Sequence, residues 1–312
     1  MITGQDREGK NRGKRNLILV IGCAVAVIAV AGLIYTIIEY GKSDRIYEKA
    51  AEEFVVILPE ENDEADSNGN HSIKGEKDSV VPDSPEGEKD TAKTAKSDEN
   101  NKREISEKEA LPADGREWYQ LASVDLERLT AAYPDVVGWI YFENEKISYP
   151  IVYSGDNTTY LRTAYTGKSA TAGSIFLDGE STPDFSDPHT LIYGHNMRNL
   201  SMFGRLGSYL TEKGYYDDHR YFQIFLDGRV YRYEIFAYGE IPANSSVYEA
   251  YGQTPGQAQM RDLLNVLEKL GADGADVEAG PSDHLLTLST CTKDGDVRVI
   301  VSAVRVDEHA YG

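Results

Sequence analysis

The feature that most constrains this chain is an uninterrupted apolar segment near its N-terminus, residues 17–38. It carries no charged side chain, and a helix of this length, at about 1.5 Å per residue, crosses a hydrocarbon core of roughly 30 Å. The segment is too long for the core of a signal peptide, and no small-residue cleavage site follows it. The basic residues just before it are Arg7, Lys10, Arg12, Lys14 and Arg15. We therefore expect a transmembrane signal-anchor helix at 17–38, a cytoplasmic basic tail at 1–16, and the remainder outside the cell.

Two segments of very different composition follow. Residues 39–58 predict a juxtamembrane helix, because apolar side chains recur at helical spacing at Ile46, Ala50, Phe54 and Ile57. This helix is either a stalk, the simpler interpretation, or an element packed on the next domain. Residues 59–110 are acidic, with 16 acidic and 8 basic residues between 59 and 109 and no aromatic side chain. Such a segment cannot bury enough apolar surface to fold, so we expect a disordered linker that tethers the domain to the membrane.

The remaining residues, 111–312, are enough for one domain with a full core. Residues 117–132 have the apolar spacing of a helix, which Tyr133-Pro134 would end. A second helix is predicted at 254–270 from its regularly spaced leucines. Short runs rich in Val, Ile, Tyr and Phe predict eight strands, at 138–141, 147–152, 173–177, 190–193, 221–225, 229–238, 285–291 and 297–306. The fold class is therefore mainly β with flanking helices, a barrel or a sandwich.

Charge and cysteine content exclude several functions. The chain has 32 basic and 52 acidic residues, a net charge of −20, and no basic cluster beyond the N-terminal tail, so nucleic-acid binding is disfavoured. Cys23 lies in the apolar segment and Cys291 has no partner in the external domain, which leaves that thiol free. The histidines form no HExxH pattern and no cysteines are paired. We expect no metal and no cofactor.

Three residues at predicted strand ends suggest covalent chemistry on a carbonyl. Cys291 ends the run 285–291, and His195 follows an apolar strand that finishes in glycine. Turn-forming residues between Cys291 and Arg298 predict a hairpin that sets these two side by side. A thiolate is a strong nucleophile, an imidazole carries its proton, and a guanidinium stabilises an oxyanion. Taken singly, each residue type is more often structural.

Arg305 is a poorer candidate for the third residue. It lies seven residues beyond Arg298, about 23 Å along a strand, and the odd spacing places it on the opposite face.

Several motifs, in order, resemble the sortase family, specifically class B. They are Val137-Gly-Trp-Ile140, Ile147-Ser-Tyr-Pro-Ile-Val152, Ala172-Gly-Ser-Ile-Phe-Leu-Asp178, Tyr193-Gly-His-Asn-Met197, Ser201-Met-Phe-Gly204 and Thr287-Leu-Ser-Thr-Cys291. The resemblance covers about residues 117–306. It implies a closed eight-stranded sortase β-barrel, with a helix before the cysteine strand that walls a peptide groove. The long acidic insert departs from the family pattern.

The resemblance also implies an activity, that of a cysteine transpeptidase of Gram-positive bacteria. Such an enzyme cuts a C-terminal sorting motif of secreted proteins after a threonine and joins the acyl group to an amine of a peptidoglycan precursor or a pilin. On this pattern Cys291 is the nucleophile, His195 protonates the leaving amine, and Arg298 positions the peptide and stabilises the oxyanion. The Thr292 backbone amide is a second oxyanion donor, and Ser289 contacts substrate.

Two further residues, Thr290 and Asp178, receive no role in the reaction. Strand alternation turns Thr290 away from Cys291. No acidic side chain that would orient His195 is evident, and we interpret Asp178 as a solvated residue at a strand end.

Other functions stay open. A cysteine protease would release the same acyl-enzyme to water. A surface adhesive domain without catalysis is a second alternative. Within the sortase pattern, wall anchoring is favoured over polymerisation of pilins through a lysine acceptor, because no extra lid segment with an inhibitory motif is evident.

Overall fold

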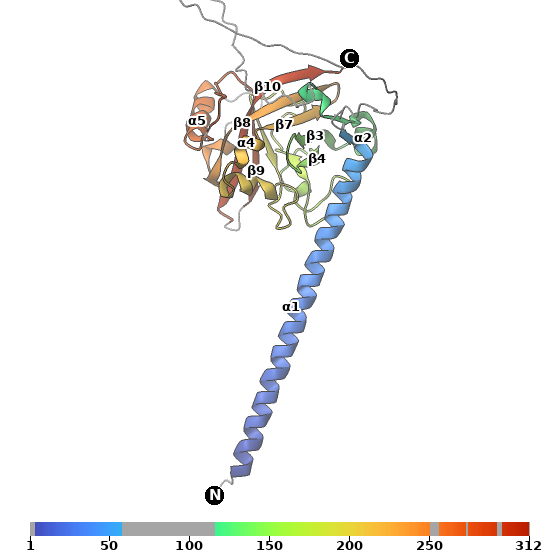
Figure 1. Cartoon of the computed structure of the whole chain (residues 1–312), viewed down its shortest axis with the longest axis vertical. Helices are drawn as coiled ribbons and strands as arrows, with labels where there is room; N and C mark the ends of the chain where they lie inside the picture. Colours follow the sequence, from blue (N-terminus) through green and yellow to red (C-terminus); the bar gives the residue numbers. More distant parts are fainter. Residues whose placement is uncertain (1–3, 58–115, 250–255, 273, 292–294, 312) are drawn as a thin grey trace, which may run out of the picture. The chain divides into compact units, whose positions relative to one another are not determined.

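The computed structural model describes residues 4–57, 116–249, 256–272, 274–291 and 295–311 (Figure 1). The chain divides into two units, one made of Met1–Leu58 with Tyr119–Gly312 and the other of Pro59–Trp118. The helices are α1 (Gly4–Phe54), α2 (Leu126–Ala132), α3 (Ser208–Thr211), α4 (Tyr215–Asp218) and α5 (Gln257–Glu268). Single 3₁₀ turns are η1 (Trp118–Gln120), η2 (Thr159–Leu161), η3 (Gly204–Gly207) and η4 (Ser246–Tyr248). The strands are β1 (Val55–Ile57), β2 (Ala122–Val124), β3 (Val136–Phe142), β4 (Ser148–Val152), β5 (Ile175–Leu177), β6 (His189–Tyr193), β7 (Tyr221–Leu226), β8 (Arg229–Pro242), β9 (Leu285–Cys291) and β10 (Val297–Ala310).

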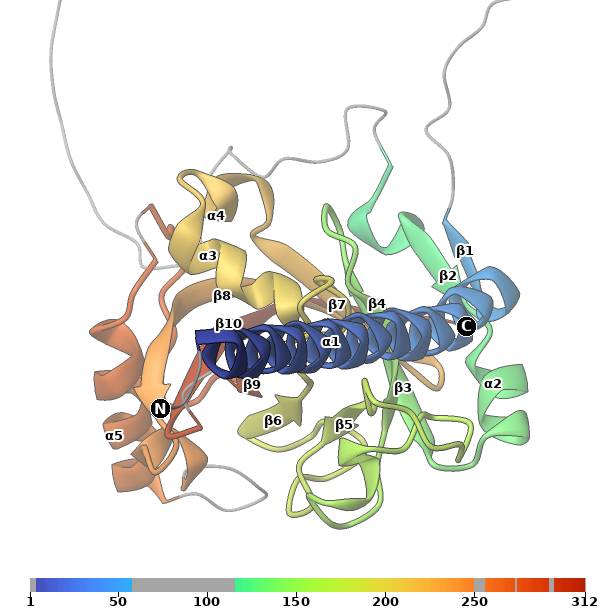
Figure 2. The same ribbon diagram turned by 90° about the horizontal axis from the view of Figure 1, so that it is seen from below.

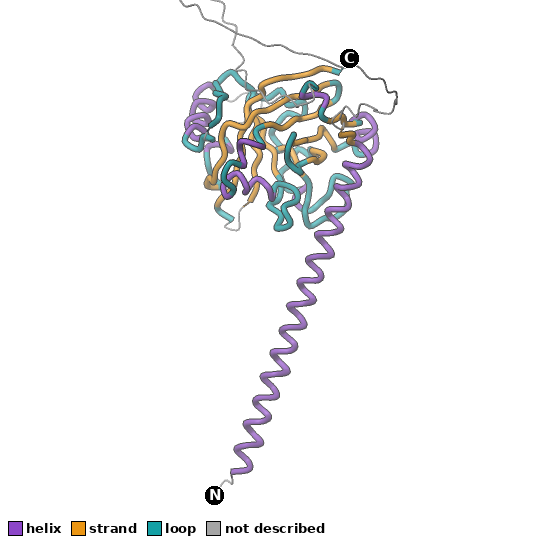
Figure 3. Tube along the Cα trace, viewed as in Figure 1, coloured by secondary structure: helices purple, strands orange, loops and turns teal. Residues whose placement is uncertain are grey.

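Strands β3 to β10 form a closed barrel in the order β10-β8-β7-β3-β4-β5-β6-β9. Figure 3 shows the strands in orange and the loops that join them in teal. Pairing is antiparallel except between β4 and β5 and between β6 and β9. Closure leaves none of these strands with an unpaired edge. The eight strands correspond to the eight predicted runs, and the expected closed eight-stranded barrel is confirmed.

The barrel encloses an apolar core. Among the described residues, the largest fully buried side chains include Trp139, Phe142, Phe203, Phe222, Phe225 and Tyr233. Outside the barrel, α5 buries Met260, Leu263, Leu264 and Leu267 against residues of β8, β9 and β10. Figure 2 shows α5 beside β8. The predicted helix at 254–270 is therefore confirmed in position, with shorter bounds.

α1 combines a membrane-compatible segment with a docked end. Within it, Cys23–Phe54 includes a window long and apolar enough to cross a membrane, with a mean hydropathy of 2.0 and no part buried in the protein. The last turns of α1 instead pack on the barrel through Ser43, Tyr47, Ala50 and Phe54, all buried. Of the two interpretations, the structure shows the packed helix as far as Phe54, while Val55–Ile57, predicted as part of the helix, form strand β1.

The segment between β1 and β2 begins and ends at one place. β1 pairs antiparallel with β2, with Ile57 opposite Ala122 and Val55 opposite Val124. Residues 59–110 themselves lie outside the described residues. Both flanking strands belong to the barrel unit, and the disordered tether expected at 59–110 stays a prediction.

The predicted helix at 117–132 is only half correct. Residues Leu126–Ala132 are helical, while Ala122–Val124 form β2. The Asp125 side chain accepts a hydrogen bond from the Arg128 amide at 3.1 Å, which caps the helix where it begins. Pairing with β1 overrides the helical preference of the preceding residues.

Candidate active site

A pocket of about 360 Å³ lies where β6 and β9 end. Three of the predicted site residues line it, namely His195, Ser289 and Arg298. The other lining residues are Asn157, Leu161, Phe176, Tyr193, Gly194 and Thr290. The structure therefore brings together residues that are about a hundred positions apart in the sequence.

The parallel pair β6–β9 explains how His195 reaches this pocket. Tyr193 is opposite Ser289, and the Gly194 amide donates to the Ser289 carbonyl at 3.1 Å. Parallel strands finish at the same barrel end, so the loop after β6 delivers His195 next to the end of β9. A Cβ on Gly194 would lie 2.6 Å from the Phe203 ring, so a side chain at this position would clash with the ring.

The β9–β10 hairpin provides the second half of the site. Cys291 is opposite Arg298, and Ser289 is opposite Ile300. The hairpin register predicted from the sequence is confirmed. Directly opposed residues have Cβ atoms about 4.5–5.5 Å apart. Cys291 is described by its backbone alone, and Thr292 lies outside the described residues.

His195 is held by a backbone carbonyl. Its Nε2 atom lies 2.6 Å from the carbonyl oxygen of Leu161. Because a carbonyl oxygen only accepts, Nε2 carries the proton and donates it to this bond. The nitrogen left for proton exchange is therefore Nδ1.

The η2 turn that carries Leu161 is held by hydrogen bonds to two aspartates, Asp156 and Asp135. Hydrogen bonds from Thr159 and Thr158 hold the pKa of Asp156, just before the turn, well below its usual value. The Tyr160 hydroxyl donates to Asp135 at 2.6 Å, and burial together with this carboxylate raises the pKa of Tyr160.

Arg298 is anchored through one end of its guanidinium. Nη1 donates to the carbonyls of Gly295 at 2.5 Å and Val297 at 3.0 Å. Arg305 has a different environment, as the sequence predicted. It donates to the Phe185 carbonyl at 2.6 Å and lies over the Tyr231 ring at 3.6 Å.

Ser289 is buried and bonded to a residue outside the predicted site. Its hydroxyl lies 2.8 Å from that of Tyr248, which belongs to η4. Thr290, to which the sequence assigned no role, is also buried and lines the pocket.

Asp178 does not have the solvated position expected for it. The residue is 1% exposed. Its carboxylate accepts hydrogen bonds from the Tyr193 hydroxyl, the Asn157 amide group and the Glu180 amide, each at 2.9 Å. These donors compensate for burial of the charge, so the interpretation as a solvated strand end is wrong.

Asn157 and Leu161 are pocket residues that sequence reasoning missed. Leu161 contributes a backbone carbonyl, which no side-chain pattern reveals, and Asn157 lies in an unremarkable polar loop.

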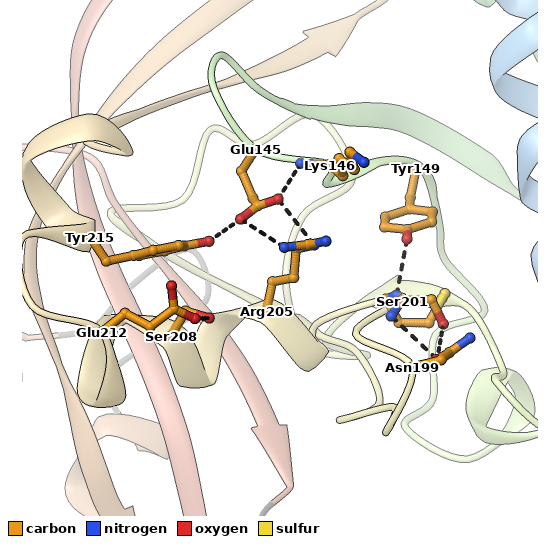
Figure 4. A network of polar contacts seen from close by, with 10 residues as sticks. Glu145, Lys146, Tyr149, Asn199, Ser201, Arg205, Ser208, Glu212 and Tyr215 are labelled. Atoms are coloured by element: carbon orange, nitrogen blue, oxygen red, sulfur yellow. Dashed lines mark hydrogen bonds and ion pairs between the residues drawn. The ribbon is translucent and has the colours of Figure 1, made fainter.

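The loop after His195 is fixed by polar contacts from several elements (Figure 4). The Tyr149 hydroxyl accepts a hydrogen bond from the Met202 amide at 3.0 Å, and the Ser201 hydroxyl donates to Asn199 at 2.8 Å. Arg205 pairs with Glu145 at 3.0 Å, and Tyr215 donates to the same carboxylate.

The loop after His195 also folds back on the histidine itself. The Phe203 amide donates a hydrogen bond to the His195 carbonyl at 3.1 Å.

Comparison with known proteins places this arrangement in a family. The model of the sortase domain matches residues 141–306. Sortase B of Listeria monocytogenes is 36% identical over 172 residues, which cover 55% of this chain and 68% of that protein. Sortase B of Staphylococcus aureus is 24% identical over 165 residues, 53% of this chain and 66% of that protein.

Solved structures agree. Sortase B of Clostridium perfringens superposes with a TM-score of 0.54 at 27% identity, covering 58% of this chain and all of that chain, 100%. Sortase B of Listeria monocytogenes gives a TM-score of 0.50 at 34% identity, covering 57% of this chain and 99% of that chain. The barrel, the family match and these relatives lead to one conclusion: this chain belongs to the sortase family of transpeptidases, in class B.

Proposed function

We propose that this chain cuts a C-terminal sorting motif of secreted proteins after its threonine and transfers the acyl group to an amine of peptidoglycan, which anchors surface proteins to the cell wall. The observation that supports this most is the meeting of three strands at one barrel end. There Cys291 is paired with Arg298, and His195 follows the strand beside Cys291. These residues supply the nucleophile, the proton carrier and the cationic donor that acyl transfer needs.

The proposed reaction has two balanced steps. The Cys291 thiolate attacks the threonine carbonyl, the peptide C–N bond breaks, and the departing amine takes a proton from His195 to leave a thioester. The acceptor amine then attacks the thioester, returns a proton to His195 and releases the thiolate. Nδ1 is the exchanging nitrogen, because Nε2 is engaged with the Leu161 carbonyl.

Arg298 and the end of β9 would stabilise the oxyanion of each step. The bonds from Nη1 to Gly295 and Val297 fix the guanidinium beside the pocket, and its other N–H groups donate to the substrate carbonyl. The Thr292 backbone amide acts as a second donor, and Ser289 contacts the peptide from the pocket wall.

The membrane-compatible part of α1 supports a cell-membrane location. The basic residues before it favour a cytoplasmic N-terminus with the catalytic domain outside. The partners are then secreted proteins with a sorting motif, the peptidoglycan precursor that supplies the amine, and the membrane itself.

The test is a library of C-terminal peptides offered to the full chain in detergent, with an oligoglycine or wall-peptide amine present. We expect one class of motif to be cut after threonine and ligated to the amine. If only hydrolysis products accumulate at saturating amine, the chain acts as a protease instead. Preference for a lysine-bearing pilin peptide as acceptor would replace wall anchoring by pilus assembly.

Two variants accompany the library. Cys291→Ala and His195→Ala should lose cleavage and ligation together while keeping the melting temperature of the parent. Normal turnover by either variant would remove that residue from the site.

A further inference from the structure

The docked end of α1 reaches the surroundings of His195. Tyr47, on the barrel-facing side of the helix, is 4% exposed. Its hydroxyl donates to the carbonyl oxygen of Gly173 and lies 3.2 Å from the hydroxyl of Ser174. The extension of the membrane helix therefore contacts the turn that precedes β5.

That turn supports the carbonyl to which His195 is bonded. The Ser174 amide donates to the Tyr160 carbonyl at 3.0 Å, in the same 3₁₀ turn as Leu161. Gly173 has a φ of +56°, and a Cβ on it would lie 2.6 Å from the carbonyl oxygen of Leu161. Only glycine permits this approach, which fixes the Leu161 carbonyl against the turn that Tyr47 holds.

Two hydrogen bonds and one close approach of the backbone thus connect Tyr47 to the imidazole of His195. They run from the Tyr47 hydroxyl to Gly173, from Gly173 to the Leu161 carbonyl, and from that carbonyl to His195 Nε2 at 2.6 Å. Each contact involves a backbone group, so a shift of the turn would move the acceptor of the histidine itself.

The same helical turn also contacts the segment on the other side of His195. Asn199 donates to both carboxylate oxygens of Asp44, at 3.1 and 2.9 Å. The Tyr47 ring lies edge-on to the Tyr149 ring at 5.5 Å between centroids. Tyr149 in turn accepts the Met202 amide within the loop that follows His195 (Figure 4). One surface of α1 therefore braces both segments that flank the histidine.

We propose that Tyr47 is a positioning residue for the transpeptidation reaction. Through Gly173 it holds the Leu161 carbonyl, and this carbonyl sets the tautomer and orientation of the His195 ring. The proposal rests on the proposed role of His195 and adds the membrane anchor to the scaffold of the active site. The catalytic unit reaches its full rate only with the end of α1 docked.

The test is Tyr47→Phe in the full chain, which keeps the ring and its packing and removes only the hydroxyl. The matched control is Tyr216→Phe, because Tyr216 is another buried tyrosine, and its hydroxyl donates to the Ile235 carbonyl at 2.9 Å, away from the path described above. We expect kcat for the best-cleaved library peptide to fall about tenfold in Tyr47→Phe with KM within about twofold. The control should keep both constants.

A second readout does not depend on the substrate. In protein labelled with ¹⁵N-histidine, the ring signals of His195 are assigned by their loss in His195→Ala. We expect the parent to show a proton on Nε2, and Tyr47→Phe to show faster exchange of this proton and a mixture of tautomers. Tyr216→Phe should give the signals of the parent.

The outcomes separate the two proposals. Unchanged ring signals in Tyr47→Phe overturn the positioning role, whatever kcat does. An equal loss of kcat in both tyrosine variants, together with lower melting temperatures, overturns it as well, since the loss then reflects stability. Altered ring signals in a protein whose parent does not ligate peptides support the positioning of the His195 ring by Tyr47 and reject the proposed function.

Discussion

At the scale of single residues, Asp178 joins the walls of the pocket. Its carboxylate binds the Tyr193 hydroxyl of β6 and the Asn157 side chain of the β4–η2 loop, and both of these residues line the pocket. Asn157 also accepts a hydrogen bond from the Gly179 amide at 2.8 Å. Two hydrogen bonds therefore join the β4–η2 loop to the residues that follow β5. A buried carboxylate with three donors is thus part of the support of the site.

We predict that Asp178→Asn lowers the free energy of unfolding by about 2 kcal/mol. The substitution replaces one accepting oxygen by an NH2 group, so at least one of the surrounding donors loses its acceptor. The peptide KM should rise as Asn157 and Tyr193 are released. Chemical unfolding in detergent measures the first effect and peptide kinetics the second.

The control for this substitution is Asp184→Asn, an exposed aspartate whose side chain accepts the Ser186 amide at 3.0 Å. Its free energy of unfolding should change by less than about 0.5 kcal/mol. Equal effects of the two substitutions would mean that the buried hydrogen bonds of Asp178 contribute no more to the free energy of unfolding than the exposed one of Asp184.

At the scale of elements, the end of α1 is part of the barrel unit. Tyr47, Ala50 and Phe54 are buried there, and Arg128 of α2 lies over the Phe54 ring at 5.1 Å and pairs with Glu53. A domain that starts at residue 111 would lack these side chains and the strand that pairs with β2.

We predict that a soluble domain starting at residue 42 melts about 10 °C or more above one starting at residue 111, because burying two large side chains contributes about 1.5–3 kcal/mol each. Calorimetry of the two purified domains measures the difference. Equal melting temperatures would mean that the docked turns contribute nothing to stability.

The elements also show what sequence patterns can and cannot reveal. The eight barrel strands and the pairing of Cys291 with Arg298 were predictable, because β-branched and aromatic runs and a turn between them are local signals. The pairing of Val55 with Val124 was not, since it joins three-residue strands from opposite sides of a long acidic segment. The Leu161 carbonyl and the contact of Tyr47 with Gly173 depend on backbone positions, which side-chain patterns do not encode.

At the scale of the whole molecule, the membrane-compatible helix α1 runs directly into the barrel unit. Because Ile57 and Ala122 are neighbours, the acidic segment between them leaves and returns at one place. Antiparallel partners lie about 5 Å apart, and we therefore expect that the docked end of α1, not this segment, sets the distance between membrane and barrel.

We predict that replacing residues 62–112 by a short Gly-Ser linker leaves ligation of a membrane-anchored substrate in vesicles within about twofold of the parent, because a shorter loop changes the closure entropy only slightly. Inserting the same linker at Gly41, between the apolar segment and the docked turns, is the matched control and should reduce ligation. A large loss of ligation on excision, with no effect of the insertion, would mean that residues 59–110 act as the tether between membrane and domain.

The most direct test of the whole account is mass spectrometry of the full chain mixed with the best-cleaved peptide, before and after addition of the acceptor amine. We predict an acyl adduct on the proteolytic fragment that contains Cys291, which disappears as a ligated peptide forms. An adduct on any other residue, or an adduct released only as the free acid at saturating amine, would contradict the account.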